Sequence, residues 1–370
     1  MDFTLEIYTS LIKSLQNSRY NFTRFDDYKS SLGTVLDNYI LIRHDVDRHP
    51  ENTLRMAQLE ADIGICGTYY FRIVPDSFDE RIIAEIAELG HEIGYHYEDV
   101  DLAVKRQTAN GKRQWSEVSG QRSELRSQRS EIRGRKSESG IRIGEPGCRS
   151  IGDMGNVEDM ENQEPVTWNP APGNRQPTTD LIDRAMESFL KNLETMRKIV
   201  DIKTICMHGS PLSPYDNRLL WTRYDYRDYG IIGEPYFDVD FSKVAYYTDT
   251  GRRWDGDAVS VRDKVIPVQR SFDVGEIQRS EVRGQRSNVS HPEPETRNME
   301  PTTGNRFPGF RTTHEMIKAI EDGRFPEKAM ITIHPQRWTN EPVLWIKELV
   351  GQSIKNIAKV GLNKYRSLKV

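Results

Sequence analysis

Carboxylate and imidazole side chains directly follow four short apolar runs of this sequence. The carboxyl ends of parallel strands meet at one edge of a sheet, so groups in these positions converge on a single site. One such residue alone is usually structural, and the recurrence at four runs is what points to chemistry. The residues are Asp45 and Asp47 after 39–42, His208 after 202–207, Asp249 after 244–248 and His334 after 330–333.

Asp45 and Asp47 are separated by a single residue. On an extended strand both side chains point to the same face, where two carboxylates repel unless a cation or a proton lies between them. A divalent cation is the simplest remedy, and His96, which follows a short glycine-containing strand, is placed to supply an imidazole ligand. The alternative is that Asp47 caps a helix beginning near Glu51.

Three motifs occur in order along the chain. They are Asp45-Val46-Asp47, Gly90-His91-Glu92-Ile93-Gly94-Tyr95-His96 and Ile331-Thr332-Ile333-His334-Pro335. Together they resemble the polysaccharide deacetylase superfamily, carbohydrate esterase family 4, and the middle motif is the most specific of the three. The resemblance covers nearly all of the chain outside two segments, 107–178 and 276–306.

The resemblance implies a distorted (β/α) barrel that removes acetyl groups from N-acetylated or O-acetylated sugars with a bound divalent metal, zinc being the one we expect first. It assigns Asp45 as the general base that activates a metal-bound water, Asp47 and His96 as metal ligands, and His334 as the general acid. These roles agree with the chemistry, because a cation lowers the pKa of water, a carboxylate accepts its proton and an imidazole returns one to the leaving group.

The chain departs from the family at Val100, where a second metal-binding histidine is the rule. Valine has no ligand atom, so we expect the third ligand to be His208, with Glu98, Asp99 or a water as alternatives. A carboxylate ligand would shift the preference toward harder cations. The arginine-proline motif that orients the base in the family also has no direct match.

Two other function classes therefore remain open beside the deacetylase. One is a catalytically silent relative that binds sugars or regulates a pathway, and it is motivated by Val100. The other is a metal-free glycoside hydrolase that uses Asp45 with a second carboxylate, which must lie roughly 5 to 9.5 Å away.

Aromatic and arginine residues further along the chain are candidates for binding the substrate. An aromatic face suits the apolar face of a sugar ring, and a guanidinium can bond hydroxyls or an anionic group on the sugar. Packing of the same side chains on the barrel is the alternative. The candidates are Tyr226, Arg252, Arg253 and Trp254.

Apolar runs alternate with helical patterns along the rest of the chain, which indicates an α/β fold with a parallel sheet. The pattern does not distinguish a barrel from an open sheet. Strands are expected at 39–42, 67–73, 202–207, 244–248 and 330–333. Helices are expected at 51–63, 80–89, 180–200, 313–322 and 343–360.

Segments 107–178 and 276–306 differ from the rest in composition. Ser-Glu pairs recur every seven residues in the first segment among Arg, Gln and Gly, and similar short sequences occur in the second segment. One apolar residue per heptad is too few for a coiled coil, so we interpret both as disordered insertions in a single domain. Without them the chain has about the size of one (β/α) barrel, roughly 250 residues.

The overall composition excludes some partners. Lys+Arg 52 against Asp+Glu 56 gives a formal charge of -4 and no basic field for nucleic acid. No apolar stretch approaches the ~18 residues of a membrane span, and the acidic start does not resemble an export signal, so we expect a cytoplasmic protein acting on a carbohydrate or sugar conjugate. Three widely spaced cysteines favour reduced thiols.

Overall fold

The computed structural model describes residues 1–31, 37–108, 178–209, 213, 215–254 and 307–367. Its centre is a curled sheet in which every strand pairing is parallel. The order is β5-β4-β3-β2-β7-β6, and β1 pairs with the first half of β2. The strands are β1 Asn21–Thr23, β2 Tyr39–Val46, β3 Thr68–Phe71, β4 Glu92–Tyr97, β5 Ile205–Met207, β6 Ala245–Thr248 and β7 Lys328–Ile333.

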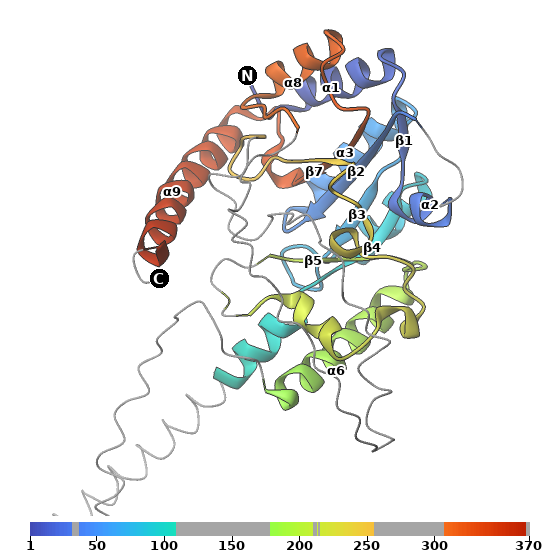
Figure 1. The fold of residues 1–370 in the computed structure, drawn as a ribbon, viewed down its shortest axis with the longest axis vertical. Helices are drawn as coiled ribbons and strands as arrows, with labels where there is room; N and C mark the ends of the chain where they lie inside the picture. Colours follow the sequence, from blue (N-terminus) through green and yellow to red (C-terminus); the bar gives the residue numbers. More distant parts are fainter. Residues whose placement is uncertain (32–36, 109–177, 210–212, 214, 255–306, 368–370) are drawn as a thin grey trace, which may run out of the picture.

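Helices cover the two sides of this sheet (Figure 1). α1 and α8 lie side by side against one part of it, α6 lies at the far side, and α9 extends away from the body. The α-helices are α1 Leu5–Asn17, α2 Phe25–Ser30, α3 Pro50–Asp62, α4 Glu80–Glu88, α6 Thr179–Arg197, α7 Pro235–Asp238, α8 Thr313–Glu321 and α9 Pro342–Ser367. Short 3₁₀ helices are η2 Asn217–Thr222, η3 Tyr226–Tyr229 and η5 Pro335–Arg337. None of the described helices is both long and apolar enough to cross a bilayer.

The predicted α/β class is confirmed, and the sheet curls as part of a barrel. Within the described residues the hydrogen-bonded path ends at β5 on one side and β6 on the other. A bridge from Thr204 to Gly233 continues the sheet beyond β5. The N-terminal elements α1, β1 and α2 were not predicted from the sequence.

The prediction for β2 was too short at its carboxyl end. The apolar run ends at Ile42, but the strand continues through Arg43, His44 and Asp45 to Val46 and all of it is buried. Polar residues can occupy a buried strand when their groups are paired. Asp45 therefore lies inside the strand, and only Asp47 follows its end.

Side chains alternate between two faces along β2. Ile40 and Ile42 belong to a core with α1 and α8, whereas Leu41 packs with Phe25 and Met330 on the concave side. Arg43 and Asp45 within β2, and Asp47 directly after it, alternate in step with Leu41. Their side chains therefore lie on the Leu41 face, inside the curl.

His44, on the other face of β2, belongs to a separate buried group. Its Nε2 lies 2.9 Å from Glu60 Oε1, and its ring stacks on Tyr69 at 3.9 Å. Glu60 also accepts hydrogen bonds from the hydroxyls of Tyr8 and Tyr69. These contacts join α1 and α3 to the sheet and make His44 a structural residue.

Gly94 allows a close approach inside the curl, as the glycines of its motif suggested. A Cβ at this position would lie 2.3 Å from the ring of Tyr70 on β3, which pairs directly opposite. The Tyr70 hydroxyl bonds the hydroxyl of Thr204, directly before β5. A larger residue would displace this ring from beneath the site.

The two predicted insertions, 107–178 and 276–306, lie almost wholly outside the described residues. A helix over residues 99–108 includes the first two positions of the first segment. The last position, Thr178, caps α6, because its side chain accepts a hydrogen bond from the Leu181 amide.

Candidate functional site

Three ligand-type atoms converge at the carboxyl edge of the sheet. Asp47 Oδ1 lies 3.4 Å from His208 Nε2 and 3.9 Å from His96 Nε2. The two imidazole rings meet edge to face with centroids 5.1 Å apart. All three atoms lie within 4.8 Å of one another, which is close enough for them to bind one cation together.

His96 is oriented for metal binding by the neighbouring strand. Its Nδ1 lies 3.0 Å from the carbonyl oxygen of Cys206, the residue paired with it on β5. A carbonyl only accepts, so Nδ1 carries the proton and Nε2 keeps its lone pair toward Asp47. Burial lowers the pKa of His96 to about 4 even though Asp45 and Asp47 act to raise it. The imidazole is therefore neutral at neutral pH, which is the form that binds a metal.

Asp47 presents one oxygen without a hydrogen-bond partner in the described structure. Its Oδ2 accepts from Gln336 at 3.1 Å, while the buried Oδ1 faces the two imidazoles. Burial raises the pKa of Asp47, but His208, His334 and His96 outweigh it and hold the pKa at about 2. The alternative role as a helix cap is not observed, because α3 is capped at His49 without a side-chain bond.

Exposure rises across the cluster from one side to the other. The His96 side chain is 2% exposed, His208 17% and Asp47 23%. The residues thus fit a divalent cation held by two imidazoles and one carboxylate with a side open to solvent. Three protein ligands and an open position are typical of catalytic rather than structural zinc sites.

His208, directly after β5, lies where a third ligand beside Asp47 and His96 could come from, whereas Val100 does not. Val100 is fully buried in the apolar core with Tyr97 and Phe189, so position 100 does not face the cluster. Asp99 is also directed elsewhere, since it accepts from the Tyr95 hydroxyl at 2.7 Å and from an amide on α6. Among the three residues predicted as the third ligand, His208 is the one whose ligand atom lies close to those of both Asp47 and His96.

Asp45 lies beside the cluster on the same face of β2 and is held by Arg43. The guanidinium donates to both carboxylate oxygens, from Nε at 2.8 Å and from Nη2 at 2.6 Å. Burial raises the pKa of Asp45, but Arg43 and His96 outweigh it and place the pKa well below its usual range. The carboxylate is therefore ionised and fixed in position.

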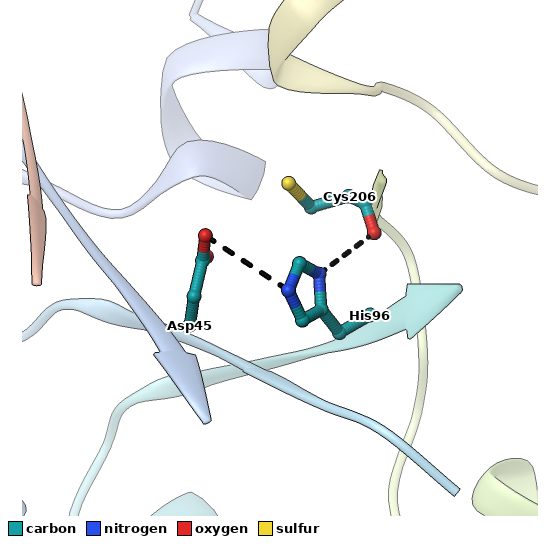
Figure 2. A group of neighbouring side chains, drawn as sticks. All are labelled: Asp45, His96 and Cys206. Atoms are coloured by element: carbon teal, nitrogen blue, oxygen red, sulfur yellow. Dashed lines mark hydrogen bonds and ion pairs between the residues drawn. The ribbon is translucent and has the colours of Figure 1, made fainter. Parts of the chain in front are cut away.

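Figure 2 shows the Asp45 carboxylate directed toward one nitrogen of the His96 ring, while the other nitrogen faces the carbonyl oxygen of Cys206. Asp45 Oδ2 lies 3.9 Å from His96 Nε2, and these three residues form a second set with ligand spacing. A cation in that set would lie next to the positive charge of Arg43. The set containing Asp47 and His208 is accordingly the better candidate.

His334, after β7, is bound to Asp249, after β6. Its Nδ1 is 2.6 Å from Asp249 Oδ1, and its backbone N–H donates to Oδ2 at 3.0 Å. Arg337 and Trp338 also donate to this fully buried carboxylate, at 2.6 and 2.8 Å. With Nδ1 engaged, Nε2 is the nitrogen left for a substrate.

Two of the predicted substrate-binding residues pack in the core beneath α9. The Trp254 ring is 2% exposed, lies near Phe3 and donates to Thr313 Oγ1 at 3.0 Å. The guanidinium of Arg252 lies between the rings of Phe3 and Trp345, at 4.9 and 4.8 Å. A ring this buried has no face open to a sugar, so these contacts correct the expectation for Trp254 and make Arg252 a structural residue.

Tyr226 is likewise a packing residue, and this too corrects the sequence-based expectation. It is 4% exposed, its hydroxyl donates to Asp238 at 2.8 Å, and its ring meets Trp221 edge to face. Arg253 is partly exposed. Its role in binding a substrate stays a prediction.

Several site residues were missed from the sequence. Arg43 has the same strand parity as Asp45 two positions later, which is a usable indication. Gln336 lies two positions after His334, and Asp249 was noted at a strand end without a role.

The Glu98 carboxylate lies 3.4 Å from His208 Nδ1, so it contacts the candidate ligand instead of the candidate cation position.

No protein-family model, curated protein or solved structure matches this chain. The resemblance to polysaccharide deacetylases therefore rests on the three motifs, and the chemistry must be argued from the geometry of the site.

Replacing Asp249 with asparagine is expected to lower turnover by about 10²- to 10⁴-fold, in the range of general acid catalysis, with cation affinity unchanged. An amide cannot accept the bonds of His334, Arg337 and Trp338 together, so the imidazole loses its fixed orientation. Steady-state kinetics and cation titration measure the two effects. Asp240→Asn, at an exposed aspartate, is the control. A further large loss on adding His334→Ala to Asp249→Asn would contradict the idea that Asp249 acts through His334.

Proposed function

We propose that this protein is a metal-dependent hydrolase that removes an acetyl group from an N-acetylated or O-acetylated carbohydrate. The observation that carries the proposal is the convergence of Asp47, His96 and His208 on one point, with Asp45 beside them on the same strand face. The carbohydrate class comes from the motif resemblance.

Two observations support including His334 in the proposed site. Gln336, two residues further on, bonds Asp47 at 3.1 Å, and His334 is close enough to act to lower the pKa of both Asp45 and Asp47. The ends of β2 and β7 are therefore tied together around the cluster.

Each side chain has a separate part in the proposed reaction. When bound, a divalent cation would polarise the acyl carbonyl and lower the pKa of a water molecule, which suits a weak base. Asp45 accepts the proton of the attacking water, and Arg43 keeps its carboxylate ionised and in position. His334 donates a proton to the leaving amine or alcohol while Asp249 holds its ring.

The test is acetate release from a panel of N-acetyl and O-acetyl sugars by the purified protein loaded with zinc, cobalt or manganese. We expect turnover that a chelator abolishes and added metal restores. Acetate release that persists after chelation would contradict the proposal. Cleavage of glycosidic bonds that a chelator leaves unaffected would favour the glycoside hydrolase alternative. Sugar binding without turnover, unaffected by Asp45→Asn, would favour a silent relative.

A further inference from the structure

Glu98 lies beside Nδ1 of His208, the ring nitrogen that does not face Asp47, and Arg72 holds its carboxylate. Arg72 donates to Glu98 Oε1 from Nε at 2.9 Å and from Nη2 at 2.7 Å. The second oxygen, Oε2, lies 3.4 Å from His208 Nδ1. Glu98 is 2% exposed, so this contact is made away from water.

We propose that Glu98, fixed by Arg72, is a positioning residue that holds His208 as the third metal ligand. The inference rests on the proposed function, because it takes the cation to lie among Asp47, His96 and His208. It also changes the role of Glu98, which the sequence suggested as a ligand in its own right.

The hydrogen-bonding atoms at this contact support the assignment. Glu98 Oε2 and His208 Nδ1 are both buried, and neither has a well-formed hydrogen bond within the described structure. A proton on Nδ1 and a small rotation of the ring would satisfy both atoms at once. The same proton leaves a lone pair on Nε2, the nitrogen that faces Asp47. Metal-binding histidines in proteins commonly donate their second nitrogen to a carboxylate in this way.

Arg72 explains why Glu98 faces the histidine and not the cation. Two hydrogen bonds fix Oε1, and Arg72 Nη1 also approaches the Asp47 carbonyl at 3.4 Å. Its positive charge balances the carboxylate, which reduces the attraction of Glu98 for a nearby cation. Glu98, Asp101 and His208 do have ligand spacing themselves, but a cation there would lie close to Arg72.

The arrangement follows from the alternation along β4. A single residue, Tyr97, separates His96 within β4 from Glu98 directly after it, so both side chains face the inside of the curl. His208 directly follows the adjacent strand β5. Its backbone N–H donates to the carbonyl oxygen of Tyr97 at 2.9 Å, which holds it beside the end of β4. One strand thus supplies a ligand and the orienting carboxylate, and the next supplies the ligand that is oriented.

The experiment measures Co²⁺ affinity and the visible absorption spectrum of the Co²⁺-loaded full chain. Glu98→Gln is expected to weaken Co²⁺ binding by about 10- to 100-fold, the usual effect of removing an outer-shell partner, with an unchanged spectrum at saturation. The matched control is Asp99→Asn, a buried carboxylate next in sequence that bonds Tyr95 and α6, and it should leave Co²⁺ affinity unchanged.

A double-mutant cycle with His208→Ala separates positioning from direct ligation. If Glu98 acts through His208, the variant carrying both changes binds Co²⁺ no more weakly than His208→Ala alone. Additive losses, a changed spectrum in Glu98→Gln, or two Co²⁺ ions per chain would overturn the inference. Arg72→Gln, expected to weaken binding in the same direction, provides the test if Glu98→Gln does not fold.

The two proposals fail differently in this experiment. Absence of Co²⁺ binding by the unaltered chain would overturn the proposed function together with the inference. Normal binding by the unaltered chain and by Glu98→Gln alike would overturn the role of Glu98 and leave the proposed function standing.

Discussion

Replacing Asp45 with asparagine is expected to reduce turnover by about 10²- to 10⁴-fold while the cation stays bound. The amide cannot accept the proton of the attacking water, but the atoms of Asp47, His96 and His208 are unchanged. Steady-state kinetics on the best acetylated sugar and titration with Zn²⁺ measure the two properties separately.

The matched control is Asp47→Asn, the same chemical change two residues along the same strand face. This variant is expected to lose cation binding first and turnover as a consequence. Asp45→Asn also leaves Arg43 against a neutral partner, and breaking a buried ion pair costs about 3–5 kcal/mol, so thermal melts must accompany the kinetics. Release of the cation from Asp45→Asn, or full turnover by it, would contradict the assigned roles.

The second large effect is expected at His208. Replacing it with alanine removes one of the three proposed ligands, so cation affinity should fall by more than the ~10- to 100-fold that outer-shell changes produce. Isothermal titration with Zn²⁺ gives the affinity, and acetate release should fall in parallel.

His314→Ala is the control for this prediction, because His314 is an exposed histidine on α8. Adding Val100→His to His208→Ala should not restore binding, since position 100 faces the core around Tyr97 and Phe189. Restoration by Val100→His, or unaltered affinity in His208→Ala, would show that the cation is held by other residues.

Much of the fold could be predicted from local pattern. The apolar runs at 202–207, 244–248 and 330–333 correspond to β5, β6 and β7, and the expected helix from 313 begins after a capping box at Thr312 and Glu315. These elements are determined by periodicity and end signals that lie within a few residues of each other. The strand β2 was predicted to end too early because its last polar residues gave no apolar signal. Arg43 and Asp45 can stay in the buried strand since they pair with each other inside the curl.

Residues with an aromatic or charged side chain were harder to place. Trp254 and Arg252 looked like sugar-binding residues by type, but they pack against Phe3 and, for Arg252, Trp345. Phe3 and Trp345 lie far from both residues in sequence, so no local pattern could reveal the contacts. Burial of such side chains depends on which segments cover them, and here those are the N-terminal residues around Phe3 and, for Arg252, helix α9.

The sequence by itself determined the chemistry available at the edge of the sheet. Asp47, His208 and His334 directly follow strands, and Asp45 and His96 are the second-last residues of theirs, so their positions depend on where runs of consecutive residues end. Only the tertiary structure decided how those groups are used. Pairing of β4 with β5 brings His208 to Asp47 and His96, where Val100 cannot serve, and it places Glu98 beside the imidazole. A ligand set needs atoms to meet within a few ångströms, and only the pairing of distant strands fixes such distances.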